Sequence, residues 1–209
     1  MNATFPRIVL VRHGETAWSK SGQHTGRSDI PLTAHGEFEA RTLAQRFAGG
    51  RFAHVLTSPL IRAARTCELA GFGAPATTEP DLVEWGYGEY EGRTTVDIRA
   101  ERPDWELFRD GCPGGESLGD VSARADRLVA RFLGCTGDAL VFAHRDILRI
   151  LAVRWLGLPL ATAERLLLAT TAVSILGRDR APHRPVIELW NDDQHVRDRD
   201  RGAGATPGT

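Results

Sequence analysis

An arginine and a histidine stand side by side directly behind an apolar run near the start of the chain. Residues 8–11 read Ile-Val-Leu-Val, and Arg12, His13 and Gly14 follow them. The pattern predicts a buried strand, and open α/β sheets hold their ligands at the carboxyl ends of strands. A histidine there can act as a nucleophile, and the Arg12 guanidinium offers a planar fork of donors that suits phosphate oxygens. Gly14 is expected to let a ligand approach the backbone closely.

Three residues alone are a weak match, and they also fit a loop histidine beside a solvated arginine. A second arginine strengthens the phosphate hypothesis, because it lies where another strand gives way to a helix. Residues 57–66 read Thr-Ser-Pro-Leu-Ile-Arg-Ala-Ala-Arg-Thr, which puts Arg62 in the first helical turn. Free backbone N–H groups and the positive end of the helix dipole favour an anion there. Arg65, one turn later, is interpreted as an exposed charge.

A second histidine also ends a strand. His144 follows the apolar residues 141–143, and an arginine comes directly after it. Two strand-terminal histidines, each next to an arginine, indicate a shared pocket. A phosphoryl group in transfer spreads negative charge over three oxygens, which donors from Arg12, Arg62 and His144 would stabilise. The same cations would disfavour protonation of His13 and keep it nucleophilic.

An acidic segment rich in aromatic residues and glycines supplies candidates for a proton donor. Residues 81–92 read Asp-Leu-Val-Glu-Trp-Gly-Tyr-Gly-Glu-Tyr-Glu-Gly and are expected to form a loop. A carboxyl group held in a partly apolar pocket has a raised pKa and can act as a general acid near neutral pH. The residue pattern does not choose among Glu84, Glu89 and Glu91, each of which also fits an ordinary surface carboxylate.

The elements that must position these residues alternate along the chain. Short apolar runs alternate with longer amphipathic segments, which predicts βα units and a mainly parallel sheet. The stretch from 71 to 117 is rich in Gly and Pro and is expected to form loops around one short helix. Strands are predicted at 7–11, 54–57, 139–143, 171–176 and 186–190, and helices from Thr33 to about 48 and at 60–70, 95–101, 117–133 and 147–155. The pattern does not give the direction of the last two strands.

The composition is that of an ordinary soluble globular protein, with 209 residues, 25% charged and 42% apolar. A net charge of −1 and a pI near 6.7 provide no basic field for nucleic acid or an anionic membrane. The three cysteines, Cys67, Cys112 and Cys135, are widely separated and lack a CxxC pattern, so they indicate neither a disulfide framework nor a zinc site. We therefore expect small buried or half-buried side chains at these positions, and neither a metal nor a cofactor.

No signal peptide or membrane span is recognised in the sequence, so a cytoplasmic location is expected. We predict a single domain over residues 1–196. The segment 197–209 alternates Arg with Asp and ends in Gly, Ala, Thr and Pro, which favours a disordered tail.

Together, the motifs resemble the histidine phosphatase superfamily, in its phosphoglycerate mutase-like branch. The similarity covers roughly residues 7–176, with the motifs in the family's order and spacing. The stretches 18–26 and 110–117 are closest to phosphatases of the sedoheptulose-bisphosphatase and acid-phosphatase type. The resemblance implies a three-layer sandwich, with helices on both sides of the sheet, and a homodimer. It rests on residues 12–16, on 57–63, on Glu84 with 87–92, and on His144.

The resemblance also implies roles for particular residues. His13 would be the residue that is transiently phosphorylated, and Glu84 would protonate the leaving group and then activate water. Arg12, Arg62 and His144 would form the phosphate pocket. Three further positions match substrate-binding stretches of the family, with Ser19 standing where the mutases usually carry asparagine: Ser19, Thr25 and Gly26.

One residue departs from the family pattern. The second histidine is normally followed by glycine, and here Arg145 and then Asp146 follow it. The long cationic side chain could crowd the phosphate site, contact an anionic substrate or point away with Asp146 at the helix start. We count Arg145 among the substrate-binding residues and expect it to alter substrate preference.

The resulting hypothesis is a metal-independent phosphomonoester hydrolase that acts on small phosphorylated metabolites, sugar phosphates above all. A phosphoglycerate mutase is the first alternative, although the stretch 92–117 is shorter than the insertion with paired arginines that the resemblance leads one to expect in mutases. The second alternative is a non-catalytic module that binds a phosphorylated ligand, which only Arg145 and Asp146 suggest.

Overall fold

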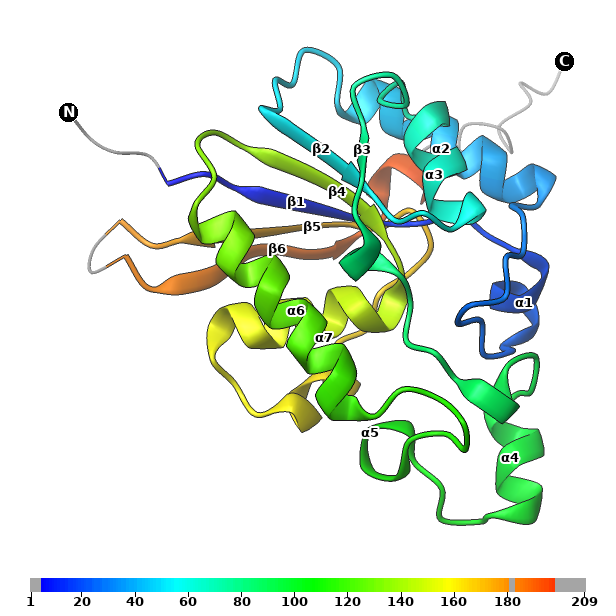
Figure 1. The fold of residues 1–209 in the computed structure, drawn as a ribbon. Coiled ribbons are helices and arrows are strands. Elements are labelled where there is room, and N and C mark those ends of the chain that lie inside the picture. The colour runs from blue at the N-terminus through cyan, green and yellow to red at the C-terminus, as the bar shows by residue number, and fades with distance from the viewer. Residues whose placement is uncertain (1–4, 181–182, 198–209) are drawn as a thin grey trace, which may run out of the picture.

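A six-stranded sheet forms the centre of the computed structural model, which describes residues 5–180 and 183–197 (Figure 1). The strands are β1 (Ile8–Arg12), β2 (His54–Thr57), β3 (Thr77–Thr78), β4 (Ala139–Ala143), β5 (Val173–Arg178) and β6 (Pro185–Asp192). They lie in the order β3-β2-β4-β1-β5-β6. The first four in this order run parallel, whereas β5 is antiparallel to both β1 and β6. The predicted mainly parallel α/β sheet is confirmed.

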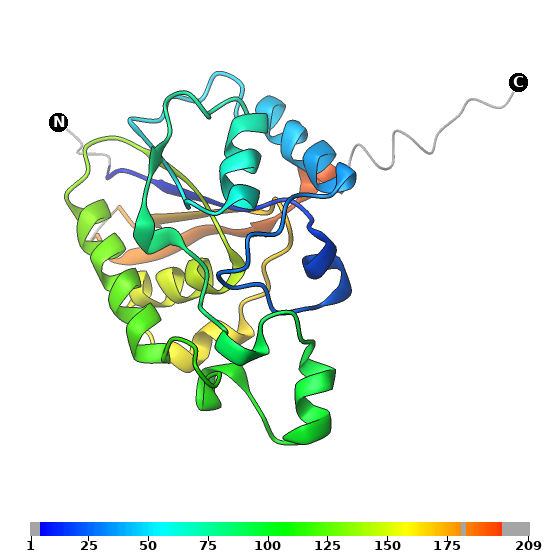
Figure 2. The same ribbon diagram turned by 45° about the vertical axis from the view of Figure 1, so that its right-hand side comes forward.

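Helices connect the strands and cover both sides of the sheet. They are α1 (Ala17–Ser21), α2 (Ala34–Arg46), α3 (Ile61–Leu69), α4 (Thr95–Glu101), α5 (Leu107–Asp110), α6 (Leu118–Leu133) and α7 (Arg145–Leu156), with the 3-10 helices η1 (Pro80–Leu82), η2 (Gly88–Tyr90) and η3 (Leu160–Arg165). Figure 2 shows α2 and α3 on one side of the sheet and α6 and α7 on the other. None of the helices in the described ranges is long and apolar enough to cross a bilayer.

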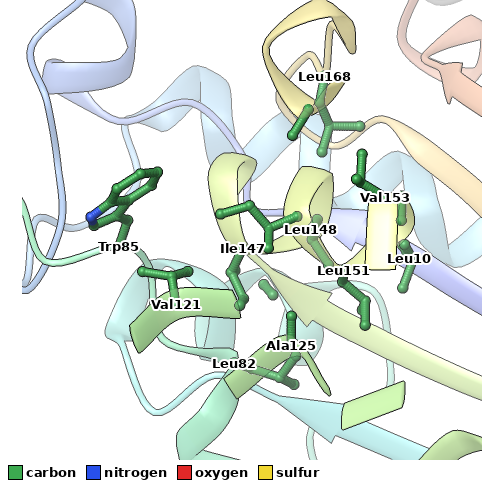
Figure 3. Close-up of a cluster of buried hydrophobic side chains, with 14 of the residues drawn as sticks. Leu10, Leu82, Trp85, Val121, Ala125, Ile147, Leu148, Leu151, Val153 and Leu168 are labelled. Carbon is green, nitrogen blue, oxygen red and sulfur yellow. The ribbon is translucent and has the colours of Figure 1, made fainter. Parts of the chain in front are cut away.

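Side chains point alternately to the two faces of the sheet along each strand. Helices cover both faces, so both sets of side chains are buried. Val9 and Val11 of β1 pack against the α2 and α3 layer, with Leu43 and Cys67. Leu10 points to the opposite layer and joins a larger cluster around α6 and α7 (Figure 3). The predicted three-layer arrangement is thereby confirmed.

Cys67 is buried and Cys112 and Cys135 are partly buried, and all three are free thiols.

The predicted elements recur with small shifts, and the additional ones are short. Thr33 and Ser117 cap α2 and α6 by accepting hydrogen bonds from the first-turn backbone. The residue pattern did not predict α1, β3, α5 or the three 3-10 helices, whose lengths of two to six residues are too short to show a period. The predicted disordered tail lies, from residue 198 onward, outside the described residues.

The start of α7 is the shift that matters for the site. The helix begins at Arg145, two residues earlier than predicted, and His144 is its N-cap. Because β2, β4 and β1 are parallel neighbours, their carboxyl ends meet at one edge of the sheet, where the backbone N–H of His13 donates to Ala143 at 2.9 Å and that of Ser58 donates to Phe142 at 2.9 Å. His13, Ser58 and His144 therefore follow three adjacent strands.

Candidate active site

One ring nitrogen of His13 is hydrogen-bonded, and the other has no hydrogen bond to any residue that the structure describes. Its Nδ1 lies 2.8 Å from the carbonyl oxygen of Gly14. Because a carbonyl only accepts, Nδ1 carries the proton, and Nε2 of the neutral ring has a lone pair. The side chain is buried. Burial, then Arg12 and Arg62, lower the pKa of His13 well below its ordinary value, which keeps the imidazole neutral.

Arg12 lies beside His13 and has an N–H donor that no described residue accepts. Its Nη1 donates to the carbonyl of Leu168 at 2.7 Å. Its Nε is buried and has no hydrogen-bond partner among the described residues. Burial and then the charge of Arg145 lower the pKa of Arg12 to about 10, so the guanidinium remains protonated at neutral pH. A buried cation with an unpaired donor is suited to an anionic ligand.

Arg62 is fully buried and uses most of its donors within the protein. Its Nη1 donates to Ser28, and its Nη2 donates to Thr25 and Gly26, in each case to the backbone carbonyl at 2.9 to 3.3 Å. Its Nε donates to Nδ1 of His144 at 3.1 Å. Arg62 thus makes four hydrogen bonds with its five N–H groups. It fastens the 25–28 loop to the strand ends as well as placing a positive charge there.

His144 lies directly against His13, with 5.2 Å between the ring centroids. Since Nδ1 accepts from Arg62, Nε2 carries the proton and donates to Oγ of Ser58 at 2.8 Å. Burial and then Arg62 lower the pKa of His144 well below its usual value. The structure therefore brings Arg62 and His144 to His13, but neither residue lines the cavity.

Only one of the three candidate acids is buried in the site. Glu84 accepts backbone N–H bonds from Asp146 and Ile147 at 3.0 to 3.2 Å, at the start of α7. Burial, and then the charge of Asp146, raise the pKa of Glu84 despite these bonds. Glu89 is exposed. Glu91 accepts from the backbone of Arg27 and Ser28 and so holds the 25–28 loop.

Arg145 points into the site and is held there by the neighbouring carboxylate. Its Nε and Nη2 each lie 3.2 Å from an oxygen of Asp146. The fully buried Asp146 also accepts from Nη1 of Arg149 at 2.6 Å and from the hydroxyl of Tyr87 at 2.5 Å. The side chain of Arg145 remains 40% exposed. It lines the same cavity as His13 and so does not point away from the site.

A small cavity joins these groups. Its volume is about 80 Å³, well below the several hundred Å³ of a typical ligand pocket, so it suits a small ligand. Ser19 and Thr25 contribute to its wall, whereas Gly26 does not. The Ser19 hydroxyl is bonded to the backbone of Thr16 in the capping box of α1. The residues that line the cavity are Arg12, His13, Ser19, Gly22, Gln23, His24, Thr25, Glu84, Tyr87, Thr95 and Arg145.

His24 is a wall residue that the sequence analysis passed over. Its ring lies 4.9 Å from that of Tyr87, and its Nε2 is 3.3 Å from the hydroxyl of Thr95. Its Nδ1 is buried without a partner in the described ranges. Burial and then Arg145 lower the pKa of His24 to about 4. The motif containing His24 was recognised, but no local pattern marks this ring as part of the pocket.

Gly14 has a different role from the expected one. A Cβ at Gly14 would lie 2.4 Å from the carbonyl oxygen of Gly36, and one at Gly36 would lie 2.1 Å from that of Glu15. The glycine therefore admits the start of α2, not a ligand.

Arg65 pairs at the surface with Glu37 and Glu68, in agreement with its interpretation as an exposed charge. In the part of the chain that the structure describes, no group of three or more His, Cys, Asp or Glu side chains could hold a metal ion.

Comparison with known proteins gives consistent matches across the chain. Residues 8–193 match the family model of the histidine phosphatase superfamily (branch 1). An acid phosphatase of Mycobacterium tuberculosis is 40% identical, with 82% of this chain and 86% of the relative aligned. Sedoheptulose 1,7-bisphosphatase of Saccharomyces cerevisiae is 37% identical over 76% of this chain and 70% of the relative. A protein named probable phosphoglycerate mutase GpmB, from Photorhabdus laumondii, is 33% identical over 91% and 94%.

Proposed function

Since this chain belongs to the histidine phosphatase superfamily, we propose that it hydrolyses phosphomonoesters of small metabolites, sugar phosphates included, without a metal ion. The observation that carries the proposal is the unprotonated Nε2 of His13 in one cavity with Arg12 and Glu84. Relatives named acid phosphatase and sedoheptulose 1,7-bisphosphatase support the reaction type. We expect the reaction to take place in the cytoplasm and the protein to form a homodimer.

In the first half of the proposed reaction, the lone pair of His13 Nε2 attacks phosphorus. A P–N bond forms as the ester P–O bond breaks, and Glu84 gives its proton to the leaving alkoxide oxygen. The raised pKa of Glu84 supports this role, because the carboxyl group must hold a proton at the working pH. The unpaired Nε of Arg12 meets the phosphoryl oxygens.

In the second half, the carboxylate of Glu84 takes a proton from water, and the water oxygen attacks phosphorus. The P–N bond breaks, its electron pair returns to Nε2, and inorganic phosphate leaves with Glu84 again protonated. Arg62 adds positive charge near the phosphoryl group, and it holds the neutral His144, together with Ser58, against His13. Ser19, Thr25 and Arg145, which line the cavity, are assigned to the organic part of the substrate.

The proposal is tested by hydrolysis of p-nitrophenyl phosphate in EDTA, with wild type and His13→Ala compared. We expect wild-type turnover, loss of turnover in the variant, and a phosphohistidine in rapidly alkali-quenched wild type. Absence of hydrolysis of any phosphoester by a folded wild type would favour the binding module. Loss of activity in EDTA that a metal restores would contradict metal independence.

The mutase alternative is supported by the relative named as a probable phosphoglycerate mutase. A coupled assay distinguishes the two reactions, because a mutase interconverts 3- and 2-phosphoglycerate faster than it releases phosphate. We expect phosphate release to be the faster process.

A further inference from the structure

Three polar groups on the cavity wall have no hydrogen-bond partner among the described residues. Nε of Arg12 and Nδ1 of His24 are buried without one. Arg145 reaches Asp146 through Nε and Nη2, and no described residue accepts from its Nη1. Buried polar groups in folded proteins are nearly always paired, so the two buried nitrogens indicate a polar ligand. The partly exposed Arg145 offers a further N–H donor at the same cavity.

Arg145 is free to serve that ligand because another arginine balances its carboxylate partner. Arg149 lies closer to Asp146, at 2.6 Å, than Arg145 does, at 3.2 Å. Tyr87 donates to the same carboxylate. One negative charge thus stands between two positive ones, and Asp146 holds Arg145 in place without cancelling the positive charge that faces the cavity.

Arg145 and Arg12 act on different parts of the cavity. After burial, Arg12 and Arg62 are the charges that most lower the pKa of His13, and Arg145 contributes less. The pKa of His24 is lowered by burial and then by Arg145, and neither Arg12 nor Arg62 is among the causes. Among the charges, Arg145 is thus the first to act on His24 and the last to act on His13, and all three residues line the same cavity.

We infer that the cavity selects small phosphomonoesters that carry a second anionic group, a carboxylate or a second phosphate, and that Arg145 binds this group. The inference rests on the proposed function and names its substrate class. Arg12 and Arg145 both line the cavity and repel each other, and an anionic group bound to each relieves that repulsion. The volume of about 80 Å³ favours a short connection between the two anions.

Matched substrate pairs test the inference. 3-Phosphoglycerate and glycerol 3-phosphate differ by a carboxylate in place of a hydroxymethyl group, and fructose 1,6-bisphosphate and fructose 6-phosphate differ by one phosphate. We expect wild type to prefer the doubly anionic member of at least one pair in kcat/KM. In Arg145→Gln that preference should fall about 10-fold or more, the size expected for one hydrogen bond to a charged group. The pair that responds identifies the second anion.

Arg154→Gln is the matched control. Arg154 lies on the same helix, pairs with Asp126 at 2.6 Å and is 36% exposed, so the control removes one comparable charge outside the cavity. Its substrate preference should equal that of wild type. The inference is overturned if wild type prefers the compound with the second anionic group in neither pair. It is also overturned if Arg145→Gln lowers kcat/KM equally for both members of each pair, because Arg145 would then serve the reacting phosphoryl group.

A binding measurement separates this inference from the proposed hydrolysis. Calorimetric titration of His13→Ala with the same pairs reports recognition without turnover. If wild type hydrolyses none of the compounds, the proposed function fails. If His13→Ala binds the compound with the second anionic group more tightly and His13→Ala/Arg145→Gln does not, the inference is still supported. Equal affinities within both pairs would overturn it.

Discussion

The chemistry of the site depends on which nitrogen of each histidine carries a proton. The Gly14 carbonyl keeps the proton of His13 on Nδ1, whereas the guanidinium of Arg62 keeps the proton of His144 on Nε2. Two neutral rings of opposite tautomer therefore lie 5.2 Å apart. Nε2 of His13 presents a lone pair to the cavity, whereas the N–H group of His144 is donated to Ser58.

Glu84→Gln tests the proton donor. An alkyl phosphate leaves as a strongly basic alkoxide and needs the proton, whereas p-nitrophenolate leaves without it. We expect kcat/KM for glycerol 3-phosphate to fall by about 10² to 10⁴, and that for p-nitrophenyl phosphate to fall far less. Steady-state assays on both esters measure the difference. An equal loss on the two esters would mean that Glu84 does not protonate the leaving group.

Arg62→Lys tests whether Arg62 is structural as well as charged. Lysine keeps the positive charge but cannot reproduce the fork of donors that binds the backbone carbonyls of the 25–28 loop. We expect the free energy of unfolding to fall by at least about 2 kcal/mol, because buried acceptors lose their partners. Urea denaturation measures this change. Arg65→Lys, on the surface of the same helix, should change it by less than about 0.5 kcal/mol.

Among the elements, the β1 end and the start of α2 determine the path of the loop that follows His13. Gly14 and Gly36 let two backbones approach more closely than any Cβ allows. The backbone N–H of Glu15 also donates to the buried carboxylate of Glu39 in α2 at 2.8 Å. The packing of a helix against this loop thus positions His13, the proposed nucleophile.

Gly36→Ala should disturb that packing. The added methyl group would lie 2.1 Å from the carbonyl oxygen of Glu15 and 2.7 Å from its nitrogen, so the loop must move. We expect a loss of about 1–3 kcal/mol in stability and at least about a 10-fold loss in kcat/KM. Gly119→Ala in α6 is the control, because its nearest atom is 3.5 Å away, and it should be neutral or stabilise by about 0.5–1 kcal/mol. A fully active Gly36→Ala would show that the loop tolerates the shift.

For the molecule as a whole, buried neutral histidines make stability depend on pH. Burial is the first cause that lowers the pKa of His13, His24, His144 and His195 in the folded state. Below about pH 6.5 the unfolded chain protonates these rings and the folded chain does not, so stability is lost as the pH falls. The raised pKa of Glu84 acts in the opposite direction, but it is one group against four.

Thermal unfolding between pH 7 and pH 5 measures this effect. We expect Tm to decrease steadily with falling pH, with each histidine contributing at most about 1.4 kcal/mol per pH unit. His24→Gln should make the decrease less steep, because one of the four rings no longer titrates. A Tm that is constant or rises toward pH 5 would contradict the assignment of these histidines as neutral in the folded protein.

The sequence by itself determined the α/β class with a mainly parallel sheet, most boundaries of the longer elements and the candidate nucleophile His13. Strand and helix signals are local, and His13 and Arg12 directly follow a strand whose apolar pattern predicts burial. A local helix signal likewise predicts that Arg62 lies in the first turn of a helix, as it does in α3. Resemblance to the family then ranked Glu84 above Glu89 and Glu91, which the residue pattern had left equal.

Only the tertiary structure decided how these residues are held. Glu84 meets the start of α7 across about 60 residues of sequence, and Arg62 meets His144 across about 80. No local pattern records which donors are consumed by backbone carbonyls, or that Asp146 turns Arg145 toward the cavity. Hydrogen bonding and desolvation depend on neighbours that folding brings together, and for this reason the tautomers, the pKa shifts and the place of Arg145 could be read only from the folded chain.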